Sequence, residues 1–289
     1  MKLLVVVIFC LLLWPFYLDA QNNSMTDSTE INENKKAIRK AGRKLARQEM
    51  KQHFSVGLSA TYSWINSGAR FEEKNSIFSA QIDLEQHLGL ADQKWIYSGF
   101  IIYRMTPRSG FNGLYYQLNR RKDYILSDDV IFMEDTIDKG TEIGGYFNTK
   151  VASFGYLFSI LTDPKAFLGI YVNFYFAEIK LGINAESINV KRNVTYIAAT
   201  PNFGFVASFM LRKWLVVGGG VGMFFYDTKN LSGSFYDMQV VAEFYPAKWL
   251  GLSIGYRVFD VKAKFPEENY NTYINYNLKG PSAGLRFKF

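Results

Sequence analysis

The chain has 289 residues, of which 48% are hydrophobic and 17% aromatic, and its formal net charge is +7. Its mean hydropathy of -0.06 is far below that of a helical membrane protein, and 19 Tyr with 25 Phe exceed what a soluble β-sandwich usually carries. This composition is typical of a membrane β-barrel with aromatic girdles, and the length allows one barrel without a second globular domain.

Residues 1–20 have the order of a secretory signal peptide. Lys2 gives a positive start, an apolar run extends over residues 3–13, and Leu18-Asp19-Ala20 offers a cleavage site. A transmembrane anchor is the alternative, but the run is short for a bilayer crossing. The only cysteine, Cys10, lies in this run, so the mature chain is expected to hold no disulfide and no cysteine-ligated metal.

Residues 21–53 are expected to form a disordered segment followed by a short basic helix. The stretch 21–34 is rich in Asn, Ser and Thr, and residues 33–51 carry eight Lys and Arg against two Glu. The helix is either a solvated periplasmic linker or a basic face for anionic lipid head groups or another polyanion. Nucleic acid is not an expected partner, because an exported chain does not meet it.

Residues 54–289 predict an all-β fold, a transmembrane antiparallel up-and-down β-barrel. Segments of alternating apolar and polar residues follow one another, as in strands with one face toward lipid and one toward a polar lumen. In one clear example, an apolar face is opposed by a more polar one: Leu168, Ile170, Val172, Phe174 and Phe176 against Tyr171, Asn173 and Tyr175.

Short and long connections alternate along the predicted barrel, as periplasmic turns and external loops do. The short turns are expected at residues 106–109, 162–165, 212–213 and 246–248, and the long polar loops at 121–140, 184–194, 228–233 and 264–271. This alternation places Phe289 at the periplasmic rim.

The strand number has two solutions. Counting back from Phe289 gives ten strands, the first beginning near Ser76, and leaves residues 55–65 as an eleventh candidate. Because an odd number cannot leave both ends on the periplasmic side, either 55–65 lies outside the closed barrel or residues 270–289 form two strands split near Gly280-Pro281. The apolar positions change there from even to odd, which a β-bulge would also explain. Ten strands are favoured, with twelve as the alternative.

The last ten residues alternate strictly and end on an aromatic. Ala283, Leu285, Phe287 and Phe289 form the apolar face. This ending resembles the C-terminal signature of bacterial outer-membrane β-barrels, whose terminal aromatic is read by the barrel-assembly machinery. The resemblance implies that Phe287 and Phe289 act as the assembly signal and that the chain resides in the cell outer membrane.

A second resemblance begins at about Ser76 and extends to the end. The run Ile82-Asp83-Leu84-Glu85-Gln86-His87-Leu88-Gly89-Leu90 resembles an LE-x-x-LGL element in a group of Gram-negative outer-membrane barrels of unassigned role. Residues 116–120, 129–132, 140–143 and 153–156 and the closing Gly280-Pro281 resemble its other landmarks. The similarity implies barrel architecture and brings no catalytic residues. The chain is more distantly similar to OmpW-like and OmpA-like barrels, and its Asn- and Lys-rich loops suggest a source such as Bacteroidetes.

Polar residues on the predicted inner face form a candidate network that would nearly fill the lumen. The network consists of Asp83, Glu85, Gln117, Asn119, Asn173, Asn202, Asp237, Gln239, Glu243, Arg257 and Arg286. Glu243 and Arg257 are expected to form an ion pair across the turn at 246–248. The network either plugs the barrel or lines a narrow route for small solutes, with apolar ones leaving sideways.

Catalysis and metal binding have weak support in the sequence. A lipid-modifying barrel enzyme needs a Ser–His pair. The expected mature chain has only His53 and His87, and His87 is near Ser79 and Ser98 in sequence. A histidine at a strand end is more often an interface or loop residue, so no catalytic residue, cofactor-binding residue or metal ligand is predicted.

Two further motifs have simple structural explanations. The acidic pairs Asp128-Asp129 and Glu134-Asp135 are interpreted as a solvated loop rather than as a calcium site. Gly218-Gly219-Gly220 lacks the helix that follows a phosphate loop, and its glycines are expected to make room for bulky side chains from across the lumen.

These observations favour a non-enzymatic outer-membrane barrel that is structural or forms a narrow small-solute channel. One alternative is an adhesion or envelope-organising barrel that binds a partner through its external loops or its basic helix. A second alternative is a lipid-modifying enzyme, such as a lipid A or phospholipid hydrolase. The expected partners are outer-membrane lipid, lipopolysaccharide, the barrel-assembly machinery and a small solute, and no cofactor is expected.

Overall fold

The computed structural model describes residues 53–73, 79–126, 129–132, 135–163, 165–185, 190–227, 232–266 and 270–289. All of them belong to one compact unit, residues 48–289. The expected signal peptide and basic helix lie outside the described residues and stay predictions. Among the described residues, no helix is long and apolar enough to cross a membrane.

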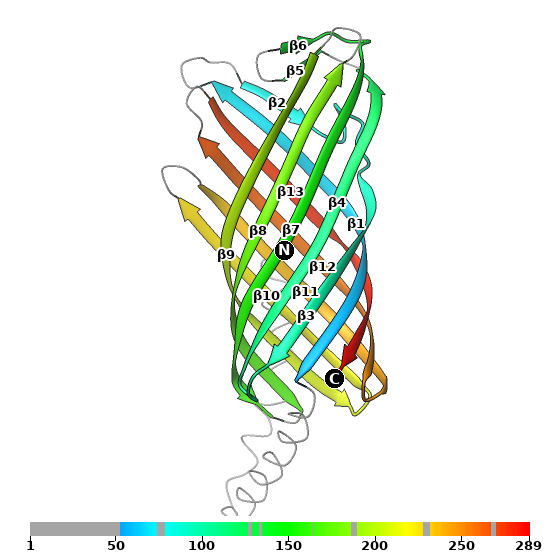
Figure 1. Ribbon diagram of the computed structural model, residues 1–289, viewed down its shortest axis with the longest axis vertical. Helices are drawn as coiled ribbons and strands as arrows, with labels where there is room; N and C mark the ends of the chain where they lie inside the picture. Colours follow the sequence, from blue (N-terminus) through cyan, green and yellow to red (C-terminus); the bar gives the residue numbers. More distant parts are fainter. Residues whose placement is uncertain are drawn as a thin grey trace, which may run out of the picture. The chain divides into compact units, whose positions relative to one another are not determined.

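Ten antiparallel strands close into an up-and-down barrel (Figure 1). In chain order they are β1 (Phe54–Glu73), β3 (Gln93–Arg104), β4 (Ser109–Ile125), β7 (Glu142–Thr162), β8 (Ala166–Ala185), β9 (Val190–Arg212), β10 (Leu215–Asp227), β11 (Ser232–Ala247), β12 (Leu250–Pro266) and β13 (Tyr270–Lys288). Each pairs with the next, and β13 pairs with β1 to close the ring. The fold class and the ten strands are confirmed.

The first strand of the barrel is not the one that the alternation near Ser76 indicated. β1 begins at Phe54 and belongs to the closed wall. The alternating segment that follows forms only β2 (Ser79–Asp83), a short strand that pairs with residues 68–72 of β1. Its alternation is explained by this pairing, and the chain then turns into the interior over residues 84–92.

The connections differ at the two ends of the barrel. The short-turn end carries the connections at 105–108, 163–165, 213–214 and 248–249 together with both ends of the wall, Phe54 and Phe289. The long-loop end carries β2 and a small hairpin of β5 (Val130–Phe132) and β6 (Asp135–Ile137). Part of each expected long loop continues the strands instead, since β8 and β9, for example, are separated only by residues 186–189.

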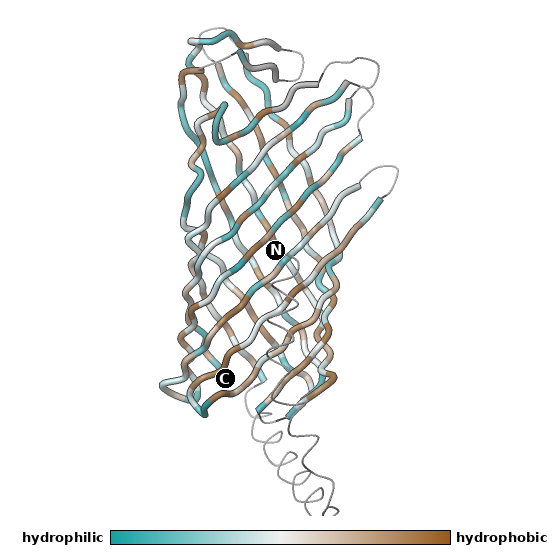
Figure 2. Tube along the Cα trace, turned by 180° about the vertical axis from the view of Figure 1, so that it is seen from behind, coloured by the Kyte–Doolittle hydropathy of each residue, from teal (hydrophilic) through white to brown (hydrophobic). Residues whose placement is uncertain are grey.

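On the long strands, the apolar residues change from one face to the other part-way along the barrel. On β1 the outward positions are apolar from Phe54 to Trp64 and polar, charged or Gly from Asn66 to Glu72. The inward positions change in the opposite sense, from Ser and Thr to the buried Ile65, Ala69 and Phe71. Figure 2 shows hydrophilic and hydrophobic residues alternating along the strands.

This exchange follows from the solvent on each side of the wall. A membrane-spanning strand needs about 9–11 residues, whereas β7 has 21 residues and β9 has 23. The half at the short-turn end has an exposed apolar belt that suits lipid, while the half at the long-loop end is polar outside and apolar inside. The same strands therefore cross a membrane and then continue into water.

The exchange also explains why the apolar residues change from even to odd positions at Gly280-Pro281. β13 keeps one register with β12 through this point, since Val258, Arg257 and Tyr256 face Lys279, Gly280 and Pro281 in turn. There is no bulge and no second strand. The apolar residues move from the inner to the outer face because the barrel passes from water into lipid, and the twelve-strand alternative is wrong.

The wall opens along two seams in the half at the long-loop end, which we call the outer half. β3 pairs with β4 only up to Ser98 and Tyr116, and β9 pairs with β10 only up to Phe203 and Met223. Farther from the short-turn end, within the described residues, β4 pairs only with β7 and β9 only with β8. Strands β4, β7, β8 and β9 thus form one sheet that faces the other strands (Figure 1), so a barrel becomes a β-sandwich with a core between two sheets.

Candidate functional site

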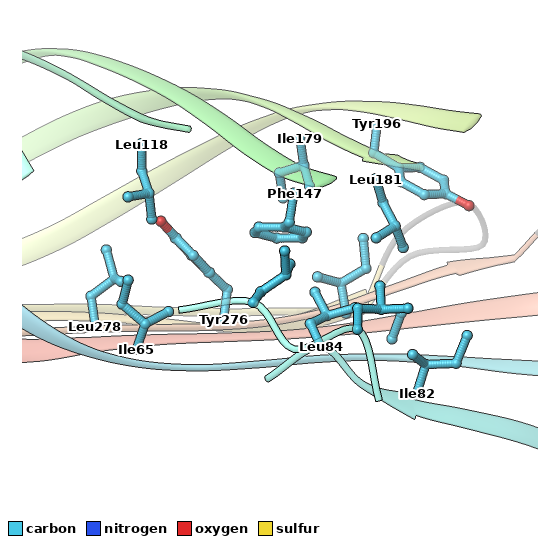
Figure 3. Close-up of a cluster of buried hydrophobic side chains, with 14 of the residues drawn as sticks. Ile65, Ile82, Leu84, Leu118, Phe147, Ile179, Leu181, Tyr196, Tyr276 and Leu278 are labelled. Atoms are coloured by element: carbon cyan, nitrogen blue, oxygen red, sulfur yellow. The ribbon is translucent and has the colours of Figure 1, made fainter. Parts of the chain in front are cut away.

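The outer half of the lumen is filled by a buried apolar cluster (Figure 3). Side chains of the β4–β9 sheet point toward those of β1 and β13, and Leu84 lies between them. The buried apolar cluster includes Ile65, Ile82, Leu84, Leu88, Leu118, Phe147, Ile179, Leu181, Tyr276 and Leu278. Burial raises the pKa of Tyr276 to about 12, so its hydroxyl stays neutral in this core.

The LE-x-x-LGL element supplies the central part of this cluster. We call residues 84–92 the inner plug, because Leu84, Leu88 and Leu90 enter the lumen and are fully or nearly fully buried. Asp83 starts the turn outside the lumen, and its carboxylate accepts the backbone N–H groups of Glu85 and Gln86 at 3.1 and 2.9 Å. Asp83 is therefore a turn cap and not a member of the lumen network.

A buried arginine fixes the inner plug to the wall. Arg120, only 1% exposed, forms an ion pair with Glu85 and donates to Ser67 Oγ at 2.6 Å. Ser67 in turn donates from its hydroxyl and its backbone N–H to the same carboxylate, at 2.7 and 2.9 Å. The guanidinium lies 5.0 Å from the ring centroid of Phe147. Three otherwise costly buried groups thus satisfy one another.

The alternation had placed the wrong residues of β4 in the lumen. Gln117 and Asn119 are exposed, and their amides bond to each other at 3.0 Å on the outer face. Arg120 points inward with Leu118 and Tyr116. The sequence signal for this was the apolar set at even positions, which marks the inner face wherever the outer face meets water.

A second ionic group lies in the membrane half of the lumen. Arg257 binds both carboxylate oxygens of Asp237 at 3.1 and 2.8 Å, and Tyr175 donates to the same carboxylate at 2.6 Å. Asp237 faces Phe259 in the ladder and Arg257 faces Gln239, so the ion pair is diagonal across neighbouring strands.

A third ionic group lies nearer the short-turn end. Arg286 donates to Glu243 at 3.0 Å, and Tyr245 donates to the same carboxylate. To reach it from β13, Arg286 crosses β12 at Gly251, where an added Cβ would lie 3.5 Å from Arg286 Cβ and 2.9 Å from the Tyr245 ring.

The expected Glu243–Arg257 pair does not form. Glu243 faces Ser253, four residues from Arg257. At about 3.3 Å per residue, this offset separates the two positions by about 13 Å. Each charge is paired with another residue of the network instead.

A layer of amides crosses the lumen beside these groups. Asn112 donates to Asn173 at 3.1 Å, and Asn173 faces Asn202 on β9. Glycines on neighbouring strands leave the space: a Cβ at Gly155 would lie 1.7 Å from Asn173 Oδ1, and one at Gly222 would lie 1.9 Å from Asn202 Oδ1. Gly155 and Gly222 thus admit side chains of neighbouring strands. Gly218-Gly219-Gly220 do not make the expected room for side chains from across the lumen, because a Cβ added at Gly218 or Gly219 would meet the adjacent strands β9 and β11.

The structure brings most of the predicted network to the inner face. Inward are Glu85, Asn173, Asn202, Asp237, Gln239, Glu243, Arg257 and Arg286. They divide into separate groups at three heights instead of forming one network. Sequence reasoning missed Arg120, Tyr175 and Tyr245, which complete these groups.

The lumen is open to water only in part. Gln239 faces inward in the membrane half and remains exposed, whereas the apolar cluster of the outer half is buried. Between these two regions lies a cavity of about 30 Å³, lined by Thr61, Ser98, Tyr116 and Arg257 among others. This volume holds about two water molecules. The lumen therefore ends against the buried apolar cluster, since Tyr116, Phe259 and Leu278 of that cluster also line the cavity.

The two histidines have structural partners. His53 Nδ1 donates to the backbone carbonyl of Arg104 at 2.9 Å, and His87 Nδ1 accepts the backbone N–H of Asp83 at 2.9 Å. Ser98 bonds to Ser59 at 2.7 Å. Among the described residues there is no group of three or more His, Cys, Asp or Glu that could hold a metal, and Asp128 and Glu134 lie outside them.

Comparison with known proteins gives only distant structural likenesses. No family model matches the chain, and no curated protein matches it. The translocator domain of autotransporter NalP from Neisseria meningitidis is similar over 89% of this chain and 98% of its own, with 11% identity and a TM-score of 0.44. The toluene transporter TbuX of Ralstonia pickettii covers 82% of this chain and 90% of its own, with 8% identity and a TM-score of 0.37.

A third likeness is to Ail, the attachment invasion locus protein of Yersinia pestis, solved with the heparin analogue sucrose octasulfate. It covers 81% of this chain and 99% of its own, with 11% identity and a TM-score of 0.35. At TM-scores below 0.5, none of these likenesses transfers a ligand or a role to this chain.

Proposed function

We propose that this protein is a non-enzymatic β-barrel of the bacterial outer membrane that is closed to through-passage and carries its external loops on a rigid stem. The observation that carries the proposal is the inner plug with its apolar core. A channel would need a continuous polar route, whereas this lumen ends at side chains packed between two sheets.

The orientation follows from the connections. Short turns and both chain ends face the periplasm in barrels of this kind, and long connections face the exterior. The short-turn end is therefore periplasmic and the sandwich half projects outward. Phe289 lies at the periplasmic rim, where its backbone N–H donates to Phe54 at 2.8 Å. Its role as an assembly signal is part of this proposal.

Ion conductance of the refolded protein in planar bilayers tests the closed state. We expect no steady conductance from the unchanged protein. Leu88→Ser should open a leak, because it places a hydroxyl in the apolar core and removes packing from the inner plug. Leu58→Ala, on the lipid-facing side of β1, is the matched control and should stay closed. A steady ohmic conductance of the unchanged protein would contradict the proposal.

A gated channel for small solutes is the second candidate. It is favoured by the exposed inward Gln239, which indicates that water enters the membrane half of the lumen. A gated channel predicts brief openings of the unchanged protein that become long-lived in Leu88→Ser. A purely structural barrel predicts no openings of the unchanged protein at any voltage that the bilayer tolerates.

A further inference from the structure

The outward face of β12, β13 and β1 carries positive charges four to six residues beyond the edge of the lipid-facing belt, on strands that run side by side (Figure 1). We call Lys262, Lys264 and Arg70 the cationic patch. Successive rows of opposed residues show its position: Val258–Lys279–Trp64 at the edge of the belt, then Asp260–Asn277–Asn66, Lys262–Asn275–Gly68 and Lys264–Tyr273–Arg70.

The cations of the patch lie against an aromatic ring, and the backbone at Gly68 beside them is not covered by a side chain of its own. Lys264 Nζ lies 5.2 Å and Arg70 Cζ 5.5 Å from the ring centroid of Tyr273, which stands between them. Gly68 has no side chain, and a Cβ added there would meet only the carbonyl oxygen of Ile82, at 3.4 Å. A small group can therefore approach the backbone between the cations.

The lysines of the patch keep their charge available. Asp260 accepts a hydrogen bond from Asn277 at 2.6 Å, and Glu72 pairs with Arg70 at 3.3 Å. Over the described part of the chain, Lys262 and Lys264 form no ion pair. The cations at a similar height on β7 and β8 differ, since Lys150 and Lys180 both pair with Glu178, at 3.8 and 2.9 Å.

We propose that the cationic patch binds the phosphate of a glycolipid head group in the outer leaflet. Neighbouring rows are about 7 Å apart and neighbouring strands about 5 Å apart, so the three long side chains can converge on one phosphate. Arg and Lys are the usual ligands of phosphate. Tyr273 and the exposed amides of Asn66 and Asn275 suit the sugar to which the phosphate is attached. This proposal rests on the orientation given under the proposed function.

Titration of the refolded full-length barrel in detergent micelles tests the site, with binding followed by native mass spectrometry. The probes are lipid A and its dephosphorylated form. The variant K262Q/K264Q/R70Q should weaken lipid A binding about tenfold or more, the effect of losing about one charged contact. The variant R121Q/K150Q/K180Q removes the same charge from the other side of the barrel and should bind within about twofold of the unchanged protein.

Three outcomes would overturn the proposal: equal binding of lipid A by K262Q/K264Q/R70Q, equal binding of dephosphorylated lipid by the unchanged protein, or displacement of lipid A by millimolar inorganic phosphate. The last would show a general anion site instead of a lipid site. Slower gel mobility after boiling verifies that each variant is folded. Failure here leaves the conductance result unaffected, so the two proposals fail separately.

Discussion

At the scale of single residues, the interior depends on charges that meet at fixed positions. Arg120, Arg257 and Arg286 each bind one carboxylate, and a Ser or Tyr hydroxyl completes each group. An uncompensated charge in such a site costs several kcal/mol. We therefore expect the contribution of each arginine to stability to depend on its own carboxylate partner. It should not depend on the residues of the other two groups.

Removing one member of the Asp237–Arg257 pair should destabilise the barrel. We expect Asp237→Asn to lower the free energy of unfolding by about 3 kcal/mol, because it leaves Arg257 without its carboxylate. Adding Arg257→Gln should recover part of this loss. The measurement is a double-mutant cycle from urea unfolding in lipid vesicles, followed by tryptophan fluorescence.

The matching cycle of Glu243→Gln with Arg257→Gln is the control. These two residues bind different partners, so their losses should add within about 0.5 kcal/mol. Coupling in the control cycle and additivity in the first cycle would mean that the strand register differs from the one described.

At the scale of single elements, each long strand is built for two solvents. β8 has apolar outward residues from Leu168 to Phe176 and then Glu178 and Lys180. Its inward residues change from Asn173 and Tyr175 to buried aliphatic ones. The strand keeps one register with β9 along its whole length, so the chemistry of the environment decides which face is apolar.

A lysine on the outward face should therefore be costly in one half of the barrel and tolerated in the other. We expect Val172→Lys to lower the free energy of unfolding in vesicles by about 2–4 kcal/mol, as for charges facing lipid near the midplane. Thr195→Lys, outward on β9 beyond the belt, should change it by at most about 0.5 kcal/mol. Urea titration measures both, and equal effects would contradict the assigned membrane position.

At the scale of the whole molecule, the barrel and the sandwich share one set of strands. The apolar belt on β1 extends from Phe54 to Trp64, which matches the roughly 9–11 residues of a membrane-spanning strand. Tryptophans mark both of its borders, with Trp64 and Trp95 on the outer side and Trp214 and Trp249 at the short-turn end.

Depth-dependent quenching by brominated lipids should show these two borders. In single-tryptophan variants that keep Trp95 or Trp249, we expect the strongest quenching from bromine near the head groups, because both side chains lie at an interface. A tryptophan introduced at Val172 is the reference for the midplane and should be quenched most by bromine near the chain ends. Equal depth for all three would exclude the belt as the membrane-spanning region.

The amino-acid sequence by itself determined the class of the fold, the number of strands and the short turns, but not which segment forms the first strand. Two-residue alternation, turn residues and a closing aromatic are local properties, and they need no knowledge of what packs against a strand. For the same reason the sequence correctly placed Asn173, Asn202 and Asp237 on the inner face.

Only the tertiary structure decided where lipid ends and the core begins. The pattern of a strand is the same whether its apolar face meets lipid or the opposite sheet, so Gln117 and Asn119 were assigned inward and a split at Gly280-Pro281 stayed open as the twelve-strand alternative. The ion-pair partners and the inner plug depend on contacts between distant segments, such as Arg120 with Glu85. Such contacts are set by how two sheets pack, which alternation along one strand does not encode.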